Sequence, residues 1–146
     1  MATVLPLPTP EFLSGGGRWF DETGVASVPA GALQFPLVTV PVTPAQVAIV
    51  IGVGVDAGQL TNWYWCRFEL QVNGSPDPTF NDIRGMVARL LEPVQLYRVA
   101  RPSTQVVGMV SNINGTVPFQ FAFRVFGYTF SADTEFGRKL INLRAG

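Results

Sequence analysis

Short apolar segments separated by turn-forming residues are the feature that most constrains the fold of this chain. Each segment is rich in Val, Ile, Phe, Trp or Tyr, and Pro, Gly, Asn and Asp stand between the segments. β-Branched and aromatic residues favour strands, whereas Gly, Pro, Asn and Asp favour turns. The segments that we predict to be strands are 33–42, 46–55, 63–72, 94–100, 104–111 and 117–130. Their spacing predicts an all-β chain that forms a single antiparallel β-sandwich of the jelly-roll kind.

Two of these segments indicate where their strands lie within a sheet. Pro36 and Pro41 cannot donate backbone hydrogen bonds, so we expect 33–42 to be an edge strand or an interrupted one. Residues 46–55 are apolar at both odd and even positions. Such a run is typical of a central strand that is covered on both faces.

One or two short helices are expected beside the strands. After Asn81, apolar residues recur at helical spacing over 81–91, and Pro93 ends the pattern. A second, weaker helical pattern covers residues 134–143, with Asp133 as its expected N-cap.

Residues 1–17 differ from the rest of the chain. Proline at positions 6, 8 and 10 forbids a helix and favours an extended path, and the run Gly15-Gly16-Gly17 predicts a flexible joint. We therefore divide the chain into an extended N-terminal arm, residues 1–17, and a β-sandwich domain, residues 18–146. The arm is too apolar for a solvated tail, and it packs either on its own domain or on a neighbouring molecule. On the second alternative, which we favour, its interface residues are Leu5, Leu7, Phe12 and Leu13.

Charged residues are scarce, at 14% of the chain, where about 25% is usual. Ten basic residues balance ten acidic ones, so no net charge draws the chain towards nucleic acid. A net charge near zero also removes repulsion between copies. The longest apolar run, 47–55, is far shorter than the roughly 20 residues of a membrane-spanning helix. We therefore expect no nucleic-acid partner and no membrane span, and a homo-oligomer, either a trimer or a larger lattice.

The chain contains few of the residues that commonly act in catalysis. The chain has no histidine, which removes the usual general base, the Ser-His and Cys-His nucleophile pairs and most zinc and iron sites. The carboxylates are scattered, and nothing in the sequence singles out a glycosidase pair. Cys66, the single cysteine, lies in phase with apolar neighbours and is expected in the core. We predict a protein that is not an enzyme and has no catalytic residue, no metal site and no cofactor.

The segment 63–72 is the strongest local indication of an interaction surface. Side chains alternate between the two faces of a strand. On this pattern the core face holds Tyr64, Cys66, Phe68, Leu70 and Val72, and the outer face holds Trp63, Trp65, Arg67, Glu69 and Gln71. Two exposed tryptophans need a cover, which the chain's own arm or loops, a neighbouring subunit or a stacked sugar could supply. We predict Trp63, Trp65 and Arg67 to be interface residues.

The order of features along the chain is also informative. An apolar, proline-rich arm leads through a glycine joint into a β domain rich in Val and Phe, and a short tail follows. Within the domain, RPSTQVVGMV at 101–110 is followed by VPFQFAF at 117–123. In this organisation the chain resembles small bacteriophage virion proteins of the β-sandwich or jelly-roll kind. The resemblance implies that arms and loops tie neighbouring subunits together, and many decoration and minor capsid proteins of this kind are trimeric.

These features favour a structural virion protein, either a capsid subunit or a capsid-decorating or minor capsid protein. Its partners would be copies of itself and other virion proteins, held by burial of apolar arm and sheet surface. The alternative is a carbohydrate-binding β-sandwich module in which Trp63 and Trp65 form a stacking platform. Residues 1–10 lack a basic region and are broken by prolines, so we expect no signal peptide. The expected location is the virion, after assembly in the host cytoplasm.

Overall fold

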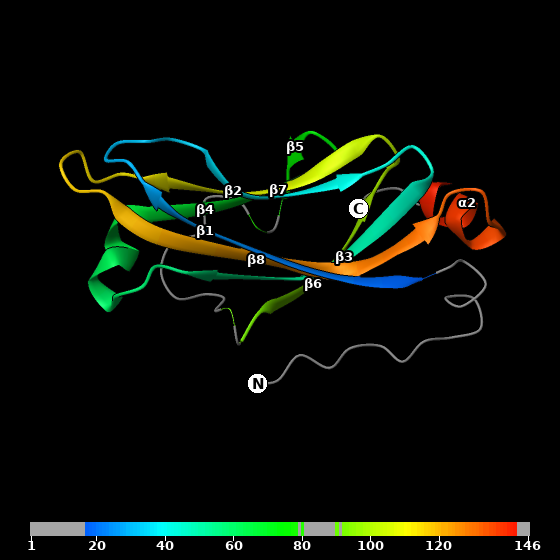
Figure 1. The fold of residues 1–146 in the computed structure, drawn as a ribbon, viewed down its shortest axis with the longest axis horizontal. Coiled ribbons are helices and arrows are strands. Elements are labelled where there is room, and N and C mark those ends of the chain that lie inside the picture. The colour runs from blue at the N-terminus through cyan, green and yellow to red at the C-terminus, as the bar shows by residue number, and fades with distance from the viewer. Residues whose placement is uncertain (1–16, 79, 81–89, 91, 143–146) are drawn as a thin grey trace.

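The computed structural model describes residues 17–78, 80, 90 and 92–142, and its strands form two stacked sheets (Figure 1). The elements, in chain order, are β1 (Arg18–Val28), β2 (Phe35–Val42), β3 (Gln46–Asp56), the 3-10 helix η1 (Leu60–Trp65), β4 (Cys66–Val72), β5 (Ser75–Pro76), β6 (Val94–Ala100), β7 (Thr104–Asn112), β8 (Phe119–Ser131) and the α-helix α2 (Glu135–Asn142). The first sheet has the strand order β1-β8-β3-β6, and the second has the order β2-β7-β4-β5.

This strand order is that of a jelly roll. β1 pairs with β8, β2 with β7, β3 with β6 and β4 with β5, and every pair is antiparallel. The first four strands thus pair, in reverse order, with the last four. The pairs alternate between the two sheets, as they do when one long antiparallel ribbon wraps into a sandwich. The structure confirms the predicted all-β fold and the single antiparallel β-sandwich.

The positions of two strands match the sequence pattern. β3 lies between β8 and β6 and is buried along most of its length, as its unbroken apolar run predicts. β2 is an edge strand of the second sheet, and its register with β7 shifts between Pro36 and Val38. The sequence pattern did not reveal β1, because this edge strand is largely exposed and polar residues interrupt its apolar alternation.

The core lies between the two sheets. The ring of Phe68 on β4 packs edge-on against Phe121 and Phe123 of β8, with ring centroids 6.0 and 6.1 Å apart. Both β8 rings are fully buried, whereas Phe119, at the start of the strand, is only partly covered. Valines from both sheets fill the space around these rings.

A second, smaller apolar cluster lies beneath α2. Leu140 packs there with Val47 of β3 and Phe130 of β8, and the ring of Phe136 lies 4.8 Å from that of Phe130. α2 therefore covers one end of the outer face of the first sheet, at the right of Figure 1.

The helix predicted over 134–143 is confirmed, but its predicted cap was wrong. Thr134, rather than Asp133, caps it, because the Thr134 hydroxyl accepts a hydrogen bond from the Gly137 amide at 3.0 Å. The cap stands one residue before Glu135, where a side-chain oxygen reaches the free amides of the first turn.

Two predicted segments lie outside the described residues. They are the arm, 1–17, of which only Gly17 is described, and the helix over 81–91, of which only Leu90 is described. Within the described part of the chain, no helix has the length and hydropathy of a membrane-spanning segment.

Candidate functional site

The segment that the sequence presents as one strand is a helical turn followed by a strand. η1 occupies Leu60–Trp65, and β4 begins only at Cys66. From Cys66 to Val72 buried and partly exposed residues alternate, so the predicted faces are confirmed there, with Arg67 facing outward. Before Cys66 the predicted alternation was wrong at Trp63 and Tyr64, whereas Trp65 is exposed as predicted.

The 3-10 turn exchanges the predicted positions of Trp63 and Tyr64: Trp63 is buried and Tyr64 is exposed. Because such a turn has about three residues, Trp63 and Cys66 fall on the same side of the chain. Trp63 is only 9% exposed and packs on Phe68, with ring centroids 5.9 Å apart. The Cys66 thiol donates a hydrogen bond to the Trp63 carbonyl, with a sulfur-to-oxygen distance of 3.7 Å. Tyr64, predicted in the core, is 83% exposed.

The corrected placement removes the two-tryptophan platform. Trp65 remains at the surface, with 41% of its area exposed, but Trp63, two residues earlier, lies in the core. A sugar therefore cannot stack on both indoles at once. The aromatic pair exposed at this point is Tyr64 and Trp65.

Three connections gather at one end of the sandwich and expose apolar side chains there. They are residues 29–34 between β1 and β2, η1 before β4, and residues 113–118 between β7 and β8, at the left of Figure 1. The exposed fractions are 73% for Leu33, 83% for Tyr64, 41% for Trp65 and 43% for Val117. We call these four residues the loop-end surface.

Backbone hydrogen bonds tie the three connections together. The Gly31 amide donates to the Asn114 carbonyl at 2.8 Å, and the Ile113 amide donates to the Trp65 carbonyl at 2.8 Å. The loop-end surface therefore lies on connections that are hydrogen-bonded to one another.

The fully buried Asn112, at the end of β7, adds side-chain hydrogen bonds to two of these connections. Its side-chain amide donates to the carbonyls of Val28 and Pro29, both at 3.3 Å, and of Val117, at 3.0 Å. Its side-chain oxygen accepts a hydrogen bond from the Asn114 amide at 3.0 Å. Sequence reasoning missed this residue, because nothing in its sequence neighbours marks an asparagine as buried.

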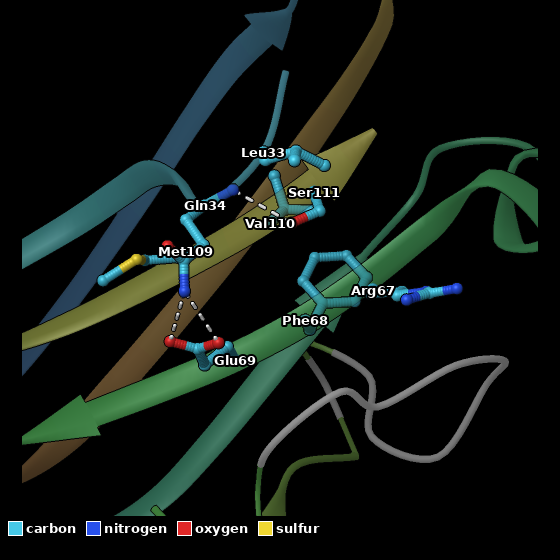
Figure 2. Close-up of a pocket in the computed structure, with 8 residues that line it drawn as sticks. All are labelled: Leu33, Gln34, Arg67, Phe68, Glu69, Met109, Val110 and Ser111. Carbon is cyan, nitrogen blue, oxygen red and sulfur yellow. Dashed lines mark hydrogen bonds between the residues drawn. The ribbon is translucent and has the colours of Figure 1, made fainter. Parts of the chain in front are cut away.

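A small pocket adjoins the loop-end surface on the outer face of the second sheet (Figure 2). Its volume is about 250 Å³, and its lining is Leu33, Gln34, Arg67, Phe68, Glu69, Met109, Val110 and Ser111. This volume is below the roughly 300–1,000 Å³ of typical small-molecule sites.

Polar contacts shape one wall of the pocket. The Gln34 amide side chain donates to the Glu69 carboxylate at 3.4 Å, as Figure 2 shows. The Gln34 backbone amide donates to the Ser111 hydroxyl at 2.9 Å. Gln71 also donates to Glu69, at 2.8 Å. The side chain of Arg67 points away from Glu69 in the same view.

The one buried carboxylate in the described part of the chain has a structural partner. Asp77 is 2% exposed and forms an ion pair with Arg98, and it accepts a hydrogen bond from the Phe80 amide at 2.8 Å. These contacts link the region after β5 to β6, at the open edge of the sandwich. Among residues 17–78, 80, 90 and 92–142 there is no group of three side chains suited to holding a metal ion.

The predicted interface residues are thus distributed in three ways. Trp65 and Arg67 lie at or near the loop-end surface, Trp63 lies in the core, and the four arm residues, Leu5, Leu7, Phe12 and Leu13, lie outside the described residues. Comparison of the chain with protein-family models and with curated proteins finds no match.

Proposed function

We propose that this protein is a structural subunit of a virion shell, as a capsid protein or a capsid-decorating protein, and that it acts by packing against copies of itself. The observation that carries the proposal is the strand order, β1-β8-β3-β6 over β2-β7-β4-β5. Eight-stranded jelly rolls recur in viral capsid proteins, lectins and cupins.

Two further features favour a shell subunit over the other jelly-roll functions. A cupin-type metal site requires histidine ligands, and the sequence has none. A lectin-like stacking platform at Trp63 and Trp65 conflicts with the burial of Trp63. Packing against other subunits, by contrast, needs only exposed apolar surface, and the loop-end surface supplies it.

The scarcity of charge points in the same direction. The chain carries only 14% charged residues and no net charge, so close approach of several copies meets little electrostatic resistance. Interface cores are depleted of charge in the same way.

Sizing of the purified full-length protein tests the proposal. Native mass spectrometry and light scattering at increasing concentration are expected to show a discrete oligomer, and electron microscopy is expected to show rings or shells. A single monomeric species at high protein concentration, with no particles formed alone or with other virion proteins, would contradict it.

A further inference from the structure

We propose that the loop-end surface of one copy is the docking site for the arm, residues 1–17, of the next copy, so that subunits associate head to tail. The proposal rests on the proposed function and specifies its contact. The occupant is a second copy of this chain, and the contact is apolar.

The first support is the absence of charge on the site. Residues 29–34, 57–65 and 113–118 contain no Asp, Glu, Lys or Arg. Of the seven large apolar side chains that the described residues expose, four form the loop-end surface. An uncharged, apolar patch on connections braced by Asn112 has the composition of an interface core.

The second support is the composition of the arm. Residues 1–17 contain one charged side chain, Glu11, and six large apolar side chains, which include Leu5, Leu7, Phe12 and Leu13. Prolines at 6, 8 and 10 restrict the backbone, so less conformational entropy is lost when the segment is bound in an extended form.

The third support is the reach of the arm. β1 pairs Arg18 with Thr129, beside α2, and Val28 with Phe119, beside the loop-end surface, so the arm joins the domain at the opposite end. The eleven residues of β1 span roughly 33 Å at about 3.3 Å per residue. Phe12 stands six residues before Arg18 and can extend at most about 22 Å from it. Phe12 and Leu13 therefore cannot reach the loop-end surface of their own chain.

The same geometry brings those two residues close to the surface of a neighbour. When the α2 end of one copy faces the loop end of the next, the arm starts beside its docking site. Such a contact joins two different surfaces, so its repetition produces a closed ring or an open helical filament.

Disulfide trapping between chains that each carry one introduced cysteine tests the contact. Cys66 is fully buried and its thiol pKa is raised to about 12, so it stays unreactive and can be left in place. A full-length chain with Leu13→Cys is mixed with a size-tagged full-length chain with Tyr64→Cys and oxidised. We expect a mixed covalent dimer on a non-reducing gel.

The matched control replaces Tyr64→Cys with Tyr97→Cys. Tyr97 is also an exposed tyrosine, but it lies on β6, away from the loop end. A yield of mixed dimer that is no greater with Tyr64→Cys than with Tyr97→Cys, in a protein that still oligomerises, would overturn the inference and leave the proposed function standing. A monomer in the sizing experiment would overturn both.

A double variant, Leu5→Cys with Tyr64→Cys, separates the two ways in which the arm could bind. Leu5 stands thirteen residues before Arg18, so an extended arm of at most about 47 Å could bring it to its own loop end. A disulfide between chains is the expected product. A disulfide within one chain would show that the arm covers its own domain, and would contradict docking on a second copy.

Discussion

The indole of Trp63 packs on the ring of Phe68, with ring centroids 5.9 Å apart and ring planes inclined by 54°. Phe68 in turn contacts Phe121 and Phe123 of the opposite sheet. Trp63 is thus the outermost member of an aromatic chain that crosses the core, whereas Trp65, two residues later, lies at the surface.

Substitution of the two tryptophans is expected to separate folding from association. Trp63→Ala removes a buried ring and should lower the free energy of unfolding by about 3–5 kcal/mol, as Phe68→Ala should. Trp65→Ala should leave folding nearly unchanged and cost at least about 2 kcal/mol of association. Chemical denaturation measures the first quantity and concentration-dependent sizing the second. Equal destabilisation of folding by both substitutions would contradict the assignment of Trp65 to an interface.

Asn112 is expected to control the order of the loop end. Asn112→Ala leaves the carbonyls of Val28 and Val117 without their side-chain donor and should lower the free energy of unfolding by about 2–3 kcal/mol. Asn114→Ala is the matched control, because the Asn114 side-chain oxygen accepts hydrogen bonds from Thr116 and Val117 of its own turn, and its loss should cost about 1 kcal/mol or less. Hydrogen exchange of the amides in 29–34 and 113–118 should accelerate in Asn112→Ala. Unchanged exchange in both connections would show that Asn112 does not tie them together.

The ion pair of Asp77 and Arg98 is expected to stabilise the domain more than that of Asp21 and Arg124. Arg98→Met leaves a buried carboxylate without its guanidinium, and should cost about 3–5 kcal/mol in the free energy of unfolding. Arg124→Met affects a carboxylate that water can still reach, and should cost less. Urea denaturation of the two variants provides the comparison. An equal loss in both would mean that burial of Asp77 has no energetic consequence.

Burial raises the pKa of the Cys66 thiol to about 12, which predicts both its reactivity and a dependence of stability on pH. A thiol-specific reagent at pH 8 should label the denatured chain quickly and the folded chain only as it unfolds, because the thiolate is the reacting form. The thiol of the unfolded chain has a pKa of about 8.5. Between that value and about 12 the unfolded state releases its proton first, so the free energy of unfolding should fall as the pH rises through this range.

Cys66→Ala provides the control for this prediction. The variant should lose the part of the pH dependence that the thiol contributes, when the two proteins are denatured at pH 8 and at pH 10. An identical pH dependence in both proteins would contradict it, as would rapid labelling of the folded chain.

Some features of the fold followed from the sequence alone, because they depend on neighbours along the chain. Alternation from Cys66 to Val72, the continuous apolar run of β3 and the prolines of the edge strand β2 each restrict local geometry in one way. Together they were sufficient for the β-sandwich, and the helical spacing after Thr134 was sufficient for α2.

Tertiary structure decided the features that depend on contacts between distant segments. The sequence 63–65 continues the alternation of β4, but the chain turns there instead, and Trp65 accepts a hydrogen bond from Ile113 of another connection. The loop-end surface exists only because the jelly-roll topology brings three separate connections to one end. Gly108 shows the same dependence: a Cβ there would lie 2.4 Å from the ring of Phe123, which comes from the opposite sheet. No local pattern marks that position for glycine, since the ring that excludes a side chain is brought there by the fold.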